Sequence, residues 1–138
     1  MGLSPPLPSA GREGHLLVTR SLAPGVVAAA EARNVVREVL TRTDHLDLVE
    51  VACLLTSELV ANAVVHGAAP VDLVVDLDDS RLAVEVIDSS DHDPLPGPAA
   101  ADDDEHGRGL SIVATLADAW GVAPGSEGKA VWFALATG

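Results

Sequence analysis

The residues best suited to chemistry are a carboxylate and a carboxamide four positions apart, Glu58 and Asn62. Apolar residues recur at helical spacing from about Leu48 to His66, so both side chains lie on one face of a predicted helix. An asparagine carbonyl oxygen suits Mg²⁺, which prefers oxygen ligands. A carboxylate one turn away can accept a proton from an attacking hydroxyl group or water. The alternative is a pair of polar residues on a solvent-exposed helix face.

Two further polar features follow along the chain. Asp88 ends an alternating strand, Leu82–Ile87, a place where an acid is often only a turn former. Gly107, Arg108 and Gly109 precede an apolar helical pattern, which predicts a glycine pair that opens a helix. Free backbone N–H groups at a helix N-terminus bind phosphate, and glycine allows the phosphate to approach. Taken alone, such a pair more often marks a simple hinge between a loop and a helix.

The hydrophobic periodicity predicts the elements that position these residues. The segment Ser89–His106 lacks periodicity, and a loop of this length is typical of a lid, a binding loop or disorder. Helices grouped on one face of a mixed, mostly antiparallel sheet make a two-layer α+β sandwich. The expected strands are 16–22, 71–77, 81–87, 120–122 and 129–135, and the expected helices are 28–41, 48–66 and 109–119.

The 138 residues are enough for one domain with one core. Residues 1–14 are rich in proline, glycine and serine and predict a flexible tail. The remaining residues, 15–138, are expected to form a single domain.

In this order, Glu58–Asn62, Asp88–Ser90 and Gly107–Gly109 resemble the N, G1 and G2 boxes of the GHKL (histidine-kinase-like) ATPase superfamily. The resemblance extends from about residue 16 to residue 135. Its nearest form is the stand-alone anti-sigma-factor serine/threonine kinase common in actinobacteria. The resemblance implies a Bergerat-type fold with a mobile ATP lid, and ATP and Mg²⁺ as cofactors.

The resemblance also assigns roles to the polar residues. It implies that Asn62 holds magnesium and that Glu58 is the catalytic base. It implies that Asp88 accepts a hydrogen bond from the exocyclic amine of adenine, and that the glycine pair with Leu110 binds phosphate. Arg108 points either to phosphate or to a partner protein.

Four further positions bear on nucleotide binding. His66 lies four residues after Asn62 and either lines the pocket mouth or is placed there by the helix dipole. Lys129 either reaches a phosphate or is an exposed residue at a strand end. Ser90 stands where the superfamily usually has glycine, and Ala130 stands where the related pattern often has threonine. Both departures weaken the expectation of nucleotide affinity.

Composition narrows the classes of partner. The formal net charge is −13 with a single lysine, which argues against nucleic acid because phosphate neutralisation needs clustered basic residues. An acidic surface suits a basic protein partner, or serves only solubility. The single cysteine, Cys53, cannot form an internal disulfide and fits a reducing cytosol. We expect no membrane span and no signal peptide.

The resemblance therefore predicts a cytoplasmic, ATP- and magnesium-binding regulatory protein. In that family the domain binds and blocks a sigma factor, and phosphorylates a serine on an anti-sigma-factor antagonist protein. A homodimer is also compatible with it. The alternative is a non-catalytic protein-binding module that uses nucleotide only as a structural ligand or binds none.

Overall fold

The computed structural model describes residues 15–66, 70–89, 104–125 and 128–137. The predicted tail, residues 1–14, and most of the predicted lid lie outside these ranges. The strands are β1 (Leu16–Leu22), β2 (Val71–Leu77), β3 (Arg81–Asp88), β4 (Ala119–Gly125) and β5 (Gly128–Ala136). The helices are α1 (Val27–Arg42), α2 (Val49–His66), which follows a short 3-10 turn at Leu46–Leu48, and α4 (Asp104–Leu116).

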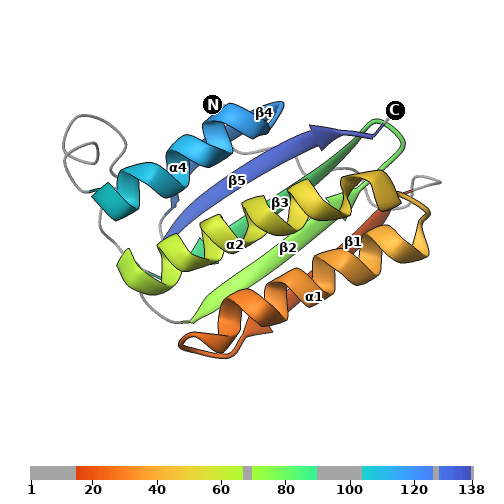
Figure 1. The fold of residues 1–138 in the computed structure, drawn as a ribbon. Helices are drawn as coiled ribbons and strands as arrows, with labels where there is room; N and C mark the ends of the chain where they lie inside the picture. Colours follow the sequence, from red (N-terminus) through yellow and green to blue (C-terminus); the bar gives the residue numbers. More distant parts are fainter. Residues whose placement is uncertain (1–14, 67–69, 90–103, 126–127, 138) are drawn as a thin grey trace.

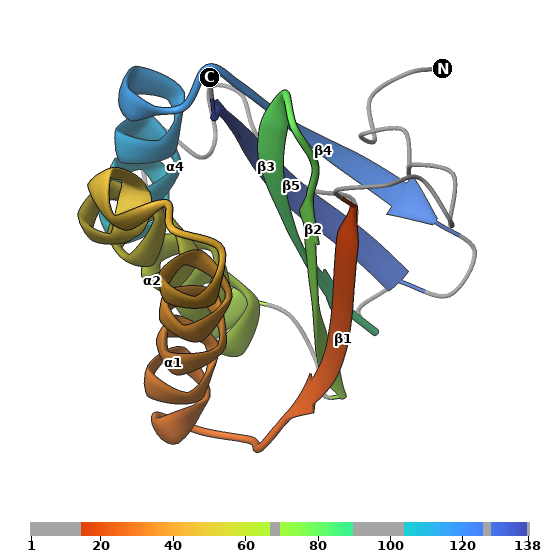
Figure 2. The same ribbon diagram turned by 90° about the vertical axis from the view of Figure 1, so that its right-hand side faces the viewer.

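The strands form one five-stranded sheet in the order β1-β2-β3-β5-β4. Helices α1, α2 and α4 cover the same face of this sheet, as the two ribbon views show together (Figure 1, Figure 2). The predicted two-layer α+β architecture is therefore confirmed. The sheet is not mixed, however, because each of the four strand pairings in the described part of the chain is antiparallel.

The main core lies between the helices and the sheet. Strands β2, β3 and β5 alternate, so every second side chain points to the helices, and the apolar ones there are buried. Helix α2 is the central helix of the helix layer, because it is apolar along much of its length and packs against both α1 and α4. The largest fully buried side chains include Phe133, Leu40, Leu55, Leu59, Leu73 and Leu82.

Helix α2 is apolar enough to resemble a membrane span. By length and composition alone the segment Leu46–Val65 could cross a bilayer, a test that the core helix of a folded domain also passes. In the fold this segment is the helix that contacts α1, α4, β3 and β5, and its residues Ala52, Leu55 and Leu59 are fully buried. Its apolar character is that of a core helix packed between two others and a sheet.

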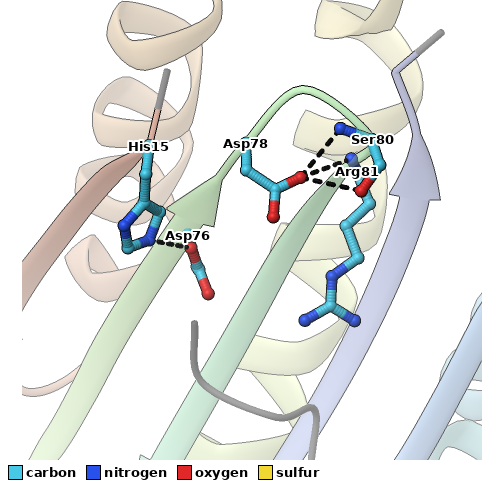
Figure 3. A network of polar contacts seen from close by, with 5 residues as sticks. All are labelled: His15, Asp76, Asp78, Ser80 and Arg81. Carbon is cyan, nitrogen blue, oxygen red and sulfur yellow. Dashed lines mark hydrogen bonds and ion pairs between the residues drawn. The ribbon is translucent and has the colours of Figure 1, made fainter. Parts of the chain in front are cut away.

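The β2–β3 hairpin is closed by a side chain. The Asp78 carboxylate accepts hydrogen bonds from Ser80 N at 2.8 Å, Ser80 Oγ at 2.9 Å and Arg81 N at 3.0 Å (Figure 3). These bonds favour the ionised form, so the backbone N–H of Ser80 above all holds the pKa of Asp78 below its ordinary value. The turn is thus tied together by one aspartate, as its Asp-Asp-Ser sequence favours.

A buried polar pair joins the start of β1 to β2. His15 Nε2 lies 2.7 Å from Asp76 Oδ1, and both side chains are almost completely buried (Figure 3). Burial raises the pKa of the Asp76 carboxyl group, and the hydrogen bond from His15 opposes that rise. Asp76 alternates with the core residues Val75 and Leu77, so the pair belongs to the helix-free face of the sheet.

Candidate functional site

The predicted site residues come from elements that meet at one end of the molecule. The C-terminal end of α2, the last residue of β3 and the first residues of α4 and β5 lie at this end (Figure 1). Helix α2 contacts α4, β3 and β5. The fold therefore packs α2, whose C-terminal half carries Glu58 and Asn62, against the strands that carry Asp88 and Lys129.

The Asn62 carboxamide has an unusual environment. Its Oδ1 atom is buried and has no hydrogen-bond partner among the residues that the structure describes. An unsatisfied buried polar atom costs roughly 1–3 kcal/mol, a cost that a bound ligand at this oxygen would remove. Thr56 Oγ1, Asp76 Oδ2 and Trp132 Nε1 are also buried without a partner among the described residues. Glu58, one turn earlier on the same face of α2, is only partly buried. The arrangement sets an oxygen ligand beside a carboxylate that solvent and substrates can reach.

Asp88 forms the second part of the site. It is the last residue of β3 and only 2% exposed, so it is a buried acid rather than a surface turn residue. Its partner across the sheet is Lys129 of β5, which is 5% exposed. Lys129 Nζ lies 3.7 Å from Asp88 Oδ2, which makes a buried ion pair. Buried ionised groups of this kind persist where they are paired.

This register corrects two expectations about β5. Lys129 is not an exposed strand-end residue, because it pairs with Asp88 across the sheet and both residues are buried. Ala130 pairs with Ile87 and therefore faces the opposite side of the sheet from Asp88. The side chain that stands beside the buried acid is that of Lys129, so the absence of a hydroxyl group at Ala130 has no bearing on Asp88.

Gly128 allows this close pairing, and the sequence reading did not single it out. Its φ angle is +153°, which side chains other than glycine rarely adopt. A Cβ atom at Gly128 would overlap the backbone carbonyl oxygen of Asp88. The glycine at the start of β5 thus lets the two backbones approach where the site acid is held. A glycine directly before an alternating strand was the signal available for this position.

The glycine pair occupies a different position from the predicted one. Helix α4 begins at Asp104, so Gly107, Arg108 and Gly109 lie inside it rather than at its start. The N–H groups of Arg108 and Gly109 fall beyond the first turn, where helical N–H groups donate to carbonyl oxygens within the helix. A glycine pair does not fix where a helix begins, because glycine is tolerated inside a helix at a cost of about 1 kcal/mol per residue.

The remaining predicted contacts are placed as follows. The side chain of Leu110 is buried in the main core with Val113. His66 is the last residue of α2. The side chains of His66 and Arg108 lie outside the described part of the structure, and Ser90 lies outside it altogether.

A known protein family matches most of the chain. The family model of the histidine kinase-like ATPase domain matches residues 22–135, which include α1, α2, the sheet from β2 onward and α4. No curated protein was found to match the chain. Domains of this family bind ATP, typically with Mg²⁺, and the unsatisfied Asn62 oxygen and the buried Asp88 are residues that fit such a ligand. The chain belongs to the histidine kinase-like ATPase family.

Proposed function

We propose that the protein is an anti-sigma factor and a serine/threonine protein kinase that phosphorylates an anti-sigma-factor antagonist. The observation that carries the catalytic part is on α2. There an unsatisfied carboxamide oxygen, Asn62 Oδ1, stands one helical turn from the partly exposed Glu58 carboxylate. A metal ligand beside a proton acceptor is what transfer of a phosphoryl group to a serine requires.

In this proposal each residue has one task. Asn62 holds Mg²⁺ through Oδ1, and Asp88 accepts a hydrogen bond from the 6-amino group of adenine. Glu58 accepts the proton of the attacking serine hydroxyl group. ATP·Mg²⁺ supplies the phosphoryl group and neutralises its charge. Glu58 can meet a protein substrate because it is not buried in the core.

The partners and location follow from charge and from the cysteine. A net charge of −13 complements a basic surface on a sigma factor, and steers encounter with it. Cys53 is buried, and burial raises the pKa of its thiol, which makes it a structural residue rather than a reactive one. A free, unreactive thiol is consistent with the cytoplasm, where we place the protein.

Transfer of labelled γ-phosphate to serine-bearing antagonist proteins encoded nearby tests the catalytic proposal. Glu58→Gln keeps the shape but removes the proton acceptor, so the transfer rate should fall by roughly 10²–10⁴ while ATP affinity changes little. Glu50→Gln is the matched control, because Glu50 is an exposed glutamate in the first turn of the same helix. Equal transfer rates for the two variants would contradict the role of Glu58.

One observation favours a second function, that of a binding module without catalysis. The glycine pair lies within α4, where its N–H groups are engaged in the helix rather than offered to phosphate. If the parent protein binds a sigma factor tightly but transfers no phosphate to any antagonist, this second function holds. Glu58 would then be an ordinary helix residue.

A further inference from the structure

Lys129 is the only lysine in the chain, and it is buried. Lysine is almost never fully buried in proteins unless it is paired, because its ammonium group loses hydration. Here the side chain lies on the helix-covered face of the sheet, at the start of β5, opposite the buried carboxylate of Asp88. The chain therefore places its one lysine side chain beside the acid of the proposed nucleotide site.

The distance between Lys129 and Asp88 shows that the two side chains are not joined by a hydrogen bond. The Nζ–Oδ2 distance of 3.7 Å is that of an ion pair but exceeds the length of a hydrogen bond. A buried ion pair of this kind adds little to folding stability, because desolvation of the charges offsets their attraction. A structural role is thus a weak reason for burying the two groups. What the pair presents is a hydrogen-bond acceptor and a donor side by side.

We infer that Lys129 reads the base of the nucleotide, by donating a hydrogen bond to the N1 ring nitrogen of adenine while Asp88 accepts one from the 6-amino group. This inference rests on the proposed nucleotide site. Adenine offers a donor and an acceptor on adjacent atoms of its Watson–Crick edge, which is the complement of a carboxylate beside an ammonium group. Lys129 is then a specificity-determining residue and not a phosphate ligand.

The same pair discriminates against guanine. A guanine base held in the same orientation turns its O6 acceptor toward the Asp88 carboxylate and its N1–H donor toward the Lys129 ammonium group. The first contact then sets two hydrogen-bond acceptors against each other, and the second sets two donors against each other. Both lie in a buried site, where unsatisfied polar groups are most costly. Lys129 therefore adds a second contact that favours adenine over guanine, beside the contact that Asp88 provides.

Titration calorimetry of the full chain tests this with ATP, GTP and 1-deaza-ATP, in which a C–H group replaces N1. The parent should bind 1-deaza-ATP about 10- to 100-fold more weakly than ATP, which is the usual worth of a hydrogen bond to a charged group. Lys129→Met should bind ATP and 1-deaza-ATP equally, and its preference for ATP over GTP should shrink by a similar factor. A preference for ATP over 1-deaza-ATP that survives in Lys129→Met would overturn the inference.

The analogue comparison in the parent needs no substitution, so it can refute the role of Lys129 even if Lys129→Met fails to fold with Asp88 buried and unpaired. Thermal unfolding without nucleotide identifies that case, and Lys129→Arg, which keeps a charged donor, should retain a preference for ATP. Equal binding of ATP and 1-deaza-ATP by the parent would refute the role of Lys129 and leave the proposed nucleotide site intact. No binding of either by the parent would refute both.

Discussion

Replacing Gly128 with alanine should destabilise the fold and disturb the site at the same time. Gly128 has a positive φ, and an added Cβ atom would overlap the carbonyl oxygen of Asp88. The obstacle is backbone rather than the tip of a flexible side chain, so β5 itself must move away from the end of β3. That movement would carry Lys129 away from Asp88.

The magnitude can be worked out with Gly25 as a reference. Gly25 also has a positive φ, of +88°, but an added Cβ atom there meets nothing within 4 Å. Gly25→Ala therefore introduces backbone strain without a steric overlap, at a cost of about 1–3 kcal/mol. Gly128→Ala adds a steric overlap, for which small-to-large changes in packed sites cost about 1–3 kcal/mol more. Each Gly→Ala change also lowers the conformational entropy of the unfolded chain, which stabilises the folded state. This effect is the same in both variants, so it cancels when their free energies of unfolding are compared.

Urea unfolding at 25 °C measures both costs. With a denaturant slope of about 1–3 kcal/mol per molar urea, the Gly128→Ala midpoint should lie roughly 1 M below that of Gly25→Ala. ATP binding should weaken in Gly128→Ala and remain unchanged in Gly25→Ala. If the two variants unfold at the same midpoint, the close approach of Gly128 to Asp88 is not a feature of the folded protein, and the reasoning fails.

Three other changes test separate parts of the structure. Asn62→Ala should weaken ATP binding about tenfold or more when Mg²⁺ is present and only a little when a chelator removes it, as measured by calorimetry. The same change should not lower the stability of the protein without nucleotide, because it removes an unsatisfied oxygen. Burial raises the pKa of Glu85 in the folded state. The protonated form therefore stabilises the fold at pH values below the ordinary pKa of 4.5, and this stability is lost as the pH rises through the raised folded-state pKa. Glu85→Gln should therefore raise the melting temperature at pH 7, and an unchanged melting temperature would contradict the raised pKa. Phe133→Ala should cost about 3–5 kcal/mol in urea unfolding because Phe133 is 0% exposed, whereas Leu116→Ala, at 44% exposure, should cost far less. Equal losses for these two would contradict the placement of the core.

The elements could be predicted from the sequence because each follows from a local pattern. The alternation of Val71–Leu77 and Arg81–Ile87 places one face of a hairpin in the core, and the structure has those strands. The apolar helical period before His66 predicts α2, which the structure confirms. The order of the three motifs Glu58–Asn62, Asp88–Ser90 and Gly107–Gly109 also indicated the family that the match over residues 22–135 establishes.

Local patterns were less informative at the ends of elements. The glycine pair predicted a helix start, but α4 begins upstream at Asp104. The residue at which a helix begins depends on capping groups, acidic residues and packing together. One or two glycines are therefore not enough to predict it.

What the sequence by itself determined is the set of chemical groups and the elements that carry them. Glu58 and Asn62 share a helix face by spacing alone. Only the tertiary structure decided that Lys129 rather than Ala130 stands beside Asp88, since the register between β3 and β5 selects which side chains share a face. It also decided that Asn62 Oδ1 is buried without a partner and that Gly128 passes against Asp88. Burial, pairing and close approach depend on atoms contributed by distant segments, so no local pattern contains them.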